Sequence, residues 1–536
     1  MRYLLHHLLD DSANRAPDRE AIVDGTRRWD YQSFSQRVDS LAAGLQSAGI
    51  RRGDRVAIFL PPTASLPLAI FAASKCGGVF VPIHHSLFPP QVSHILNDSG
   101  AKLLITDDHR LTQLAGQTET PSASIVAPTL NTVIVQGDQD IRCDWTLLDF
   151  DTVVASNSTT ANEVSCTEKE LAGILYTSGS TGRPKGVMLS HANVVAGAEI
   201  VAEYLNLTAK DRLLAALPLS FDAGLNQLTT AMLVGGTTVM IQFRFGRDIV
   251  KTLVQEKITG LAGVPSLWTL LTRPSSGLEK HSPQDLRYVT NTGGALPASI
   301  VDQLRQQLPR TDVFLMYGLT EAFRSTYLPP AEIDSRPGSM GKAIPNTEIL
   351  VVDESGNECA PGEIGELVHH GPTVSLGYWG HPELTDQVLR PHPFPPPGRR
   401  QGDLVCYSGD LVRRDEDGFL YFVGRRDHQI KSAGFRISPT EVEDVFCSIA
   451  GVRTAAVVGL PDETLGQSLA AAVVLEGDTT YSATELLARV SLALPRHMVP
   501  KQVRFVDSIA LTPNGKHDYA VVRKIFQDST LRADDD

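Results

Sequence analysis

Short apolar runs alternate with longer amphipathic segments over roughly the first 300 residues. The apolar runs, rich in β-branched residues, predict strands; they read VAIFL, GVFVPI, KLLIT, TVIV, GILYT, GTTVMI and VFLMY. Between them, segments such as FSQRVDSLAAGLQSAGI place apolar residues at helical spacing and end near a glycine. Strands that alternate with helices predict an α/β fold with layered, largely parallel sheets.

One uncharged stretch, residues 56–74, has the length of a membrane span. Pro61, Pro62 and Pro67 would break a single helix, however. We therefore expect a buried strand, a turn and a core helix here, and no membrane span.

The pattern changes near residue 340. Up to residue 425 the chain is rich in Gly, Pro and short strands, such as TEILVVD, GELVHH, DLVRRD and FLYFVG, which predict an antiparallel or β-barrel-like subdomain. The run RPHPFPPPGRRQG at 390–402 predicts an exposed loop. After Asp427 the order is helix, two strands, helix and strand. We therefore expect a large domain, 1–426, and a small α+β domain, 427–536.

Composition narrows the classes of partner. The net charge of −13, from 48 basic and 61 acidic residues, disfavours nucleic acid or an anionic membrane as the main partner. None of the six cysteines forms a C-x-x-C pair, and the N-terminus lacks the layout of a signal peptide. Scattered thiols suit a reducing compartment, so we expect a cytoplasmic location.

The most unusual segment is YTSGSTGRPKGVMLSH at 176–191, which holds two glycines and four hydroxyl side chains between Thr177 and Arg183. A surface loop is one interpretation. A P-loop is a second, but it requires G-x-x-x-x-G-K-[ST] before a helix, whereas here a strand-like VMLS follows. The third is a phosphate loop between strands, in which glycine N–H groups, hydroxyls and a lysine converge on an anion. Its residues would be Thr177, Ser178, Gly179, Ser180, Thr181, Gly182 and Lys185.

This segment resembles the signature loop of the adenylate-forming superfamily, which includes acyl-CoA synthetases, adenylation domains of peptide synthesis and beetle luciferases. Further motifs that resemble the family follow in order: NTGGALP at 291–297, YGLTEA at 317–322, YSGD at 407–410, GRRDHQIKSAGFRISPTEVE at 424–443 and LTPNGKHDY at 511–519. The resemblance implies a mobile C-terminal domain hinged to the large one, and ATP and Mg²⁺ as cofactors.

The resemblance also implies roles for individual residues. Tyr317 would stack on adenine, Thr320 would contact the α-phosphate, and Glu321 would hold Mg²⁺. Asp410 would accept hydrogen bonds from both ribose hydroxyls, and Arg425 would approach the ribose or a phosphate. The remaining adenine-site residues would be Gly293, Gly294, Ala295 and Gly318, since glycine lets the backbone approach a flat base.

A two-step mechanism is implied in the same way. Lys516 would bridge the substrate carboxylate and the α-phosphate while pyrophosphate leaves, giving an acyl-adenylate. The small domain would then rotate about Asp427 and admit a thiol past Gly434. The catalytic residues would thus be Lys516, Glu321 and Thr320.

Phe221 and Asp222 bear on the identity of the acid. Fatty-acid and aryl-acid relatives often carry an aromatic residue and a histidine here, whereas amino-acid-activating relatives carry an aspartate that pairs with the substrate ammonium. A carboxylate about 4 Å from a purely anionic ligand would cost about 4 kcal/mol at an effective dielectric of 20. Alternatively, Asp222 is a helix N-cap. Asn291 and Arg324 could also face the substrate; Arg324 could bind a second carboxylate or form a surface ion pair.

These features predict an enzyme that activates an α- or β-amino acid and transfers it to the phosphopantetheine thiol of a carrier protein. An acyl-CoA synthetase that uses coenzyme A is the close alternative. A non-catalytic nucleotide-binding module is a third, but such a module would be expected to lose Glu321 or Lys516, and the sequence contains both.

Overall fold

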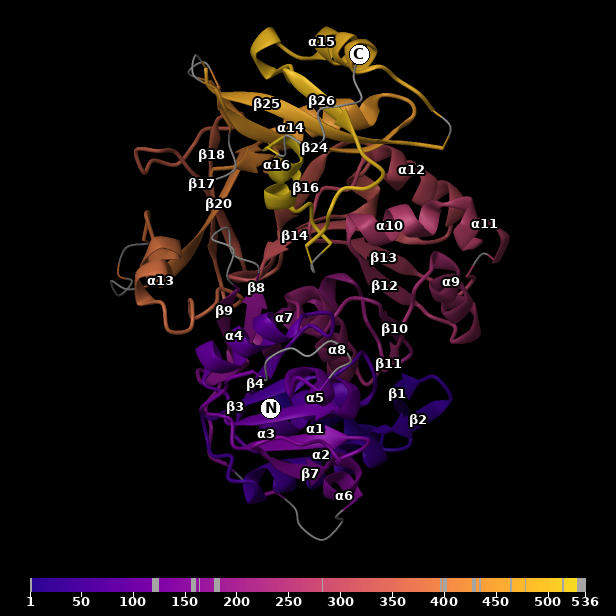
Figure 1. Ribbon diagram of the computed structural model, residues 1–536, viewed down its shortest axis with the longest axis vertical. Coiled ribbons are helices and arrows are strands. Elements are labelled where there is room, and N and C mark those ends of the chain that lie inside the picture. The colour runs from indigo at the N-terminus through magenta and orange to yellow at the C-terminus, as the bar shows by residue number, and fades with distance from the viewer. Residues whose placement is uncertain are drawn as a thin grey trace.

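The computed structural model describes residues 2–527 except 118–124, 156–160, 163, 178–183, 282, 396–397, 399–402, 427–429, 433–434, 463–464, 478 and 513–514. Figure 1 shows the N-terminal layers at the bottom and the C-terminal sheet at the top, with the long central sheet between them. None of the described helices combines the length and apolar content needed to span a bilayer.

The first sheet has the strand order β7-β6-β5-β3-β4-β8-β9. Its pairs are parallel except for the antiparallel pair β8–β9. The strands are β3 (Arg55–Phe59), β4 (Val79–Pro82), β5 (Leu103–Asp107), β6 (Thr132–Gln136), β7 (Thr146–Asp149), β8 (Leu171–Thr177) and β9 (Lys185–Ser190). Strands buried on both faces are apolar throughout, which is why these runs could be recognised in the sequence.

The second sheet begins at β2 and β1 and continues in the order β11-β10-β12-β13-β14-β15-β16. It is parallel from β1 to β14 and antiparallel beyond β14. The strands are β1 (Glu20–Asp24), β2 (Arg27–Asp30), β10 (Arg212–Ala215), β11 (Thr237–Met240), β12 (Gly260–Gly263), β13 (Tyr288–Asn291), β14 (Asp312–Leu319), β15 (Ala322–Leu328) and β16 (Ser339–Ala343).

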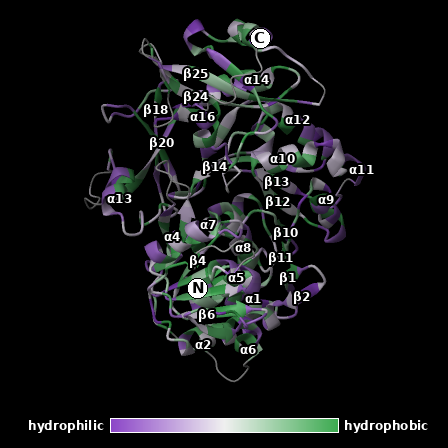
Figure 2. Cartoon of the chain, viewed as in Figure 1, coloured by the Kyte–Doolittle hydropathy of each residue, from purple (hydrophilic) through white to green (hydrophobic). Residues whose placement is uncertain are grey.

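Helices cover both sheets, as an α/β fold requires. Those of the large domain are α1 (Leu5–Arg15), α2 (Tyr31–Ser47), α3 (Ser65–Lys75), α4 (Pro89–Ser99), α5 (Asp108–Leu114), α6 (Phe150–Ala155), α7 (His191–Tyr204), α8 (Asp222–Val234), α9 (Gly246–Gln255), α10 (Pro265–Thr272), α11 (Leu278–His281), α12 (Ala298–Gln307) and α13 (Pro382–Val388). Figure 2 shows apolar residues concentrated in the strands and helices of the lower layers. The predicted α/β class is confirmed.

The stretch 56–74 forms a strand and a core helix, as expected. It contains most of β3 and of α3, where Pro67 stands in the first turn and so removes no helical hydrogen bond. α2, which packs beside α3, begins at the N-cap Asp30, whose carboxylate accepts the N–H of Ser33 at 2.7 Å.

The glycine- and proline-rich region is antiparallel, as predicted. Its strands prolong the second sheet beyond β16 in the order β21-β20-β18-β17, with β19 on the side of β20, and the described residues form no closed barrel. They are β17 (Glu348–Val352), β18 (Ile364–His370), β19 (Leu389–Pro391), β20 (Leu404–Arg414) and β21 (Leu420–Arg425). The described part of the proline-rich run after Pro391 contains no helix or strand.

The C-terminal part has its own sheet, in the order β23-β22-β25-β24 with β26 beside β25. Its elements are β22 (Ile430–Ser432), β23 (Phe435–Ile437), α14 (Pro439–Ser448), β24 (Val452–Asp462), β25 (Gly466–Leu475), α15 (Ala483–Ala493), β26 (Gln502–Phe505) and α16 (Tyr519–Gln527). The order of α14, β24, β25, α15 and β26 matches the predicted order of helix, two strands, helix and strand. The short strands β22 and β23 and the helix α16 were not predicted. The last helix, α16, is an addition to that pattern; Figure 1 shows it beneath this sheet.

Buried Glu443 of α14 anchors the chain next to Lys516. Its carboxyl group accepts the N–H of Val457 at 2.7 Å and the hydroxyl of Tyr519 at 3.1 Å. Burial raises the pKa of Glu443 from 4.5 to about 8. Since Tyr519 follows Lys516 by three residues, this contact helps to fix the hairpin that carries Lys516.

This raised pKa predicts a pH dependence of stability. The unfolded chain ionises Glu443 near pH 4.5 and the folded chain near pH 8. The stabilisation is therefore complete below about pH 4.5 and is lost as the pH rises through 8, by on the order of a few kcal/mol. Thermal unfolding of the wild type and of Glu443→Gln should show that the substitution costs more at pH 5 than at pH 9. A difference that is independent of pH would contradict the prediction.

Candidate active site

The centre of the candidate site is the hairpin formed by β14 and β15. Tyr317, near the end of β14, donates its hydroxyl hydrogen bond to Asp410 of β20, a residue that is only 4% exposed. Arg425 of β21 places Nη1 3.4 Å from the other carboxylate oxygen of Asp410. Burial, and then the charge of Asp410, hold the pKa of Tyr317 well above its usual range, so the phenol stays a neutral donor. Three residues from separate motifs therefore meet.

Glu321 lies in the turn of the same hairpin, after Thr320. Its carboxylate oxygen Oε1 accepts the hydroxyl of Tyr378 at 2.6 Å, and its backbone carbonyl accepts the N–H of Ser375 at 2.9 Å. Burial and the charge of Glu321 raise the pKa of Tyr378. The contact holds one carboxylate oxygen in place, and carboxylate oxygens are the ligands that a hard cation such as Mg²⁺ prefers.

Tyr378 also connects Glu321 to the phosphate loop. The Nζ atom of Lys185 lies 5.8 Å from the centroid of the Tyr378 ring, and the N–H of Trp379 donates to the carbonyl of Gly186 at 2.8 Å. The sequence analysis did not select Tyr378. Its segment, GPTVSLGYWG, carries no motif that was recognised there, and its partner Glu321 is 57 positions away.

The phosphate loop joins two antiparallel strands. Thr177 at the end of β8 and Lys185 at the start of β9 are register partners. The predicted residues Ser178, Gly179, Ser180, Thr181 and Gly182 lie outside the described residues. The strand after the loop excludes the P-loop arrangement, in which a helix would follow.

The glycine segment lies beside the hairpin that carries Lys516. Gly293 has a left-handed backbone, φ +80°, and a Cβ atom there would lie 3.2 Å from Val264. A Cβ atom on Gly515 would lie 3.2 Å from the same valine. The segment before Lys516 therefore touches the large domain next to Gly294 and Ala295, which are exposed, as Lys516 itself is.

The helix-capping interpretation of Asp222 is wrong. Phe221 is the N-cap of α8, Asp222 is its first residue, and no side chain caps this helix end. The ring of Phe221 stacks on His84, with centroids 5.4 Å apart. Burial lowers the pKa of His84 to about 4, so the two stacked rings next to Asp222 are uncharged near neutral pH. His84 was not selected from the sequence.

Asn291 and Arg324 are both buried. Asn291 donates a hydrogen bond from Nδ2 to the carbonyl of Gly294 at 2.9 Å. Side chains alternate along β13, and Tyr288 of this strand faces α7, so Asn291 faces away from α7. Arg324 is 3% exposed and has φ +62°, a backbone conformation that costs a non-glycine residue about 1–2 kcal/mol. A surface ion pair, the alternative raised for Arg324, is therefore wrong.

The predicted hinge Asp427 and the predicted thiol-path residue Gly434 lie outside the described residues. Asp427 falls between β21 of the long sheet and β22 of the small sheet. The domain boundary at this residue stays a prediction.

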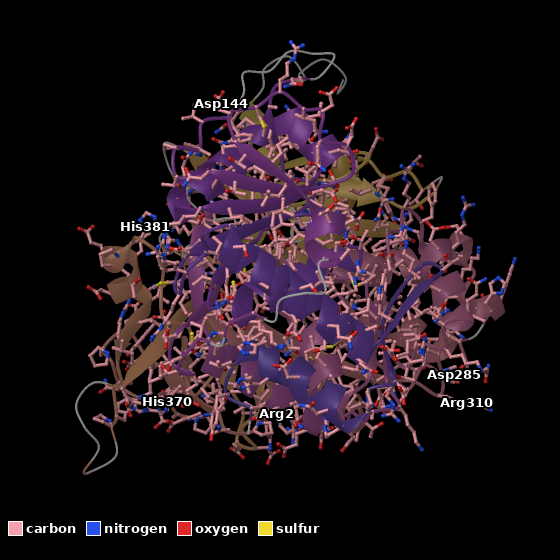
Figure 3. All side chains as sticks on the ribbon, turned by 90° about the horizontal axis from the view of Figure 1, so that it is seen from below. Arg2, Asp144, Asp285, Arg310, His370 and His381 are labelled. Atoms are coloured by element: carbon pink, nitrogen blue, oxygen red, sulfur yellow. The ribbon has the colours of Figure 1, made fainter. Side chains whose placement is uncertain are left out.

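A second group of potential metal ligands lies on the antiparallel extension of the sheet. Glu348 Oε2 is 2.9 Å from His370 Nδ1 and 3.1 Å from His392 Nε2. Figure 3 shows His370 on the same side of the molecule as His381, on the antiparallel extension. The N–H of Phe394 donates to His392 Nδ1 at 3.0 Å, so neutral His392 carries its proton on Nε2, facing Glu348. A metal ion at this cluster would need the lone pair of His392 Nε2, where the proton is bound instead. The cluster is therefore a hydrogen-bonded triad.

Comparisons with known proteins agree with the geometry. The chain matches the family "AMP-binding enzyme" over residues 9–379 and "AMP-binding enzyme C-terminal domain" over residues 441–516. It is 33% identical to feruloyl-CoA synthase of an Amycolatopsis species, over 96% of this chain and 97% of that protein. It is 29% identical to part of tyrocidine synthase 2 of Brevibacillus parabrevis, over 98% of this chain but 14% of that protein.

The fold is similar to that of ATP-bound MatB from Rhodopseudomonas palustris, with a TM-score of 0.84, 26% identity and coverage of 98% of this chain and 99% of that one. The predicted superfamily is thereby confirmed, and with it the class of AMP-forming acid–thiol ligases. The chain belongs to the AMP-binding enzyme family.

Proposed function

We propose that this enzyme uses ATP to convert a carboxylic acid to its acyl-adenylate and then forms a thioester with coenzyme A. The observation that carries the proposal is the meeting of Tyr317, Asp410 and Arg425 beside the turn that holds Glu321. Tyr317 and Glu321 of this hairpin would supply an aromatic face and a metal-binding carboxylate, and Asp410 of β20, hydrogen-bonded to Tyr317, would supply a ribose acceptor.

The nucleotide would bind on the Tyr317 side of the hairpin. Asp410 is buried next to the guanidinium of Arg425, and its carboxylate would accept hydrogen bonds from both hydroxyls of a ribose. The departing phosphates would lie between Lys185 and Glu321. Both residues meet Tyr378: the ammonium group of Lys185 lies over its ring, and the carboxylate of Glu321 accepts the hydrogen bond of its hydroxyl. Mg²⁺ held by Glu321 would neutralise charge on those phosphates.

The first step joins two anions and therefore depends on cations. A carboxylate oxygen of the acid attacks the α-phosphorus, the bond to the β-phosphate oxygen breaks, and pyrophosphate leaves. Lys516 is suited to stabilise this transition state, because its hairpin already contacts the large domain through Gly515, next to Val264 and Ser266. Its side chain is exposed and available to a ligand.

In the second step, the thiolate of coenzyme A attacks the acyl carbon and AMP leaves with the electron pair. Lys516 would have to withdraw for the thiol to reach the adenylate. Rotation about Asp427 remains a proposal for this movement. The single chain segment between β21 and β22 is consistent with it.

The acceptor that the sequence analysis placed first, a carrier-protein thiol, has less support than coenzyme A. Feruloyl-CoA synthase, named for its coenzyme A product, matches from end to end, whereas tyrocidine synthase 2 matches over a small part of its length. Amino-acid activation remains a second candidate, because Asp222 begins α8 without capping it, and its carboxylate could pair with an ammonium group.

Replacement of Lys516 tests the proposed chemistry. Lys516→Ala should lower acid-dependent ATP–pyrophosphate exchange by about 100-fold or more, because a cation at the transition state is lost. Binding of ATP, and thioester formation from a supplied acyl-adenylate, should remain. Lys524→Ala, an exposed lysine of α16, is the matched control. Normal exchange by Lys516→Ala would remove this residue from the mechanism.

Replacement of Asp222 tests the second candidate. Asp222→Asn keeps the size of the side chain and removes its charge. Pyrophosphate exchange should be measured with acids that differ only by an amine, such as propanoate and β-alanine. If the carboxylate binds ammonium, the ratio of kcat/KM values, amine over plain acid, should fall at least about 10-fold. An unchanged ratio would exclude amine recognition by Asp222.

A further inference from the structure

The β14–β15 hairpin contains a bulge, and Arg324 lies in it. Tyr317 pairs with Thr326 and Leu319 pairs with Ala322, so Gly318 alone stands opposite three residues, 323–325. Arg324 takes the left-handed conformation at this bulge, and a Cβ atom on Gly318 would lie 3.0 Å from its backbone. Bulges commonly redirect a side chain beside a binding site.

The guanidinium of Arg324 is enclosed without a matching anion. The residue is 3% exposed, and its Nε and Nη1 atoms are buried with no hydrogen-bond partner in the described part of the chain. No ion pair to a described carboxylate is found for it either, whereas Arg425 and Arg426 each face one. A buried cation is costly unless an anion accompanies it, so the site favours an anionic ligand.

This guanidinium lies close to Tyr204, the last residue of α7. Alternation along β14 sends Tyr317 toward Asp410 and sends its neighbour Met316 toward α7, where the hydroxyl of Tyr204 donates to Met316 Sδ at 3.4 Å. Arg324 is close enough to Tyr204 to lower the pKa of that phenol, against the burial that raises it. The neighbouring Phe323 packs on Gly197 of α7.

The surroundings are formed by α7 and by the aromatic rings near it. Tyr204 stacks on Tyr327 with centroids 4.4 Å apart, and α7 is joined to α8 by a hydrogen bond from Asn226 Nδ2 to the carbonyl of Gly197 at 3.1 Å. α8 is also the helix that begins with Asp222. The guanidinium is therefore close to α7, which is hydrogen-bonded to the helix that carries Asp222.

We propose that Arg324 binds a second anionic group of the acid, so that the preferred substrates are dicarboxylates of which only one carboxylate is adenylated. The guanidinium would form a charge-assisted pair with the carboxylate that does not react, and this pair would orient the other carboxylate toward the α-phosphorus. The inference rests on the proposed function, because it names the class of acid for that site.

The test compares matched acids in ATP–pyrophosphate exchange: butanoate with succinate, hexanoate with adipate, and benzoate with isophthalate. The wild type should prefer the dicarboxylate in at least one pair. Arg324→Met should lower kcat/KM for that dicarboxylate by about 100-fold or more and leave its monocarboxylate partner within about threefold. Arg324→Lys should lie between, since lysine keeps the charge but loses the bidentate geometry.

Two controls separate this role from others. Arg310→Met changes an exposed arginine, at the edge of the molecule in Figure 3, and should leave the preference unchanged. ATP affinity, measured without acid, should be the same in the wild type and in Arg324→Met; weaker ATP binding would make Arg324 a phosphate ligand and overturn the proposal. If Arg324→Met does not fold, the preference of the wild type and the Arg324→Lys result decide.

The outcomes also separate this proposal from the proposed function. Exchange with monocarboxylates in preference to all three dicarboxylates, or equal losses on both members of a pair, would overturn the role of Arg324 and leave acid activation standing. Absence of exchange with every acid would remove the proposed function and this inference with it.

Discussion

The hydrogen bond between Tyr317 and Asp410 joins the parallel part of the long sheet to its antiparallel extension. Tyr317 stands near the end of β14, where the parallel order stops, and Asp410 comes from β20, several strands away. The buried carboxylate requires a donor and a cation, and Tyr317 and Arg425 supply them. The nucleotide site that we propose exists because this contact brings the two parts of the sheet together.

The hairpin that follows Tyr317 would separate the two substrates, the nucleotide and the acid. Its turn holds Glu321 against Tyr378 and hence beside Lys185, on the side proposed for the phosphates. Its bulge holds Arg324, which lies close to Tyr204 of α7 and is proposed to bind the acid. A short segment with one strained residue can therefore orient both substrates, while the small domain brings Lys516 to the junction between them.

The strands and the family could be predicted from the sequence because their signals are local. Runs such as VAIFL are apolar throughout, since helices or neighbouring layers cover both faces of the sheet. The contacts of Tyr378 and His84 could not be predicted, because each partner, Glu321 or Phe221, is far away in sequence. Arg324 was selected, but its burial depends on the bulge, which is set by pairing between strands. Asp222 satisfied the sequence rule for a helix cap, and only the backbone shows that Phe221 holds that position.

The central claim is that the β14–β15 hairpin places the nucleotide and the acid on opposite sides. A crystal structure with a hydrolysis-resistant acyl-sulfamoyl adenosine tests it most directly. The account predicts ribose hydroxyls at Asp410, the adenine on Tyr317, and an acyl group that extends toward α7 and the guanidinium of Arg324. An adenosine that lies away from Tyr317 and Asp410, or an acyl group on the Tyr317 side, would contradict it.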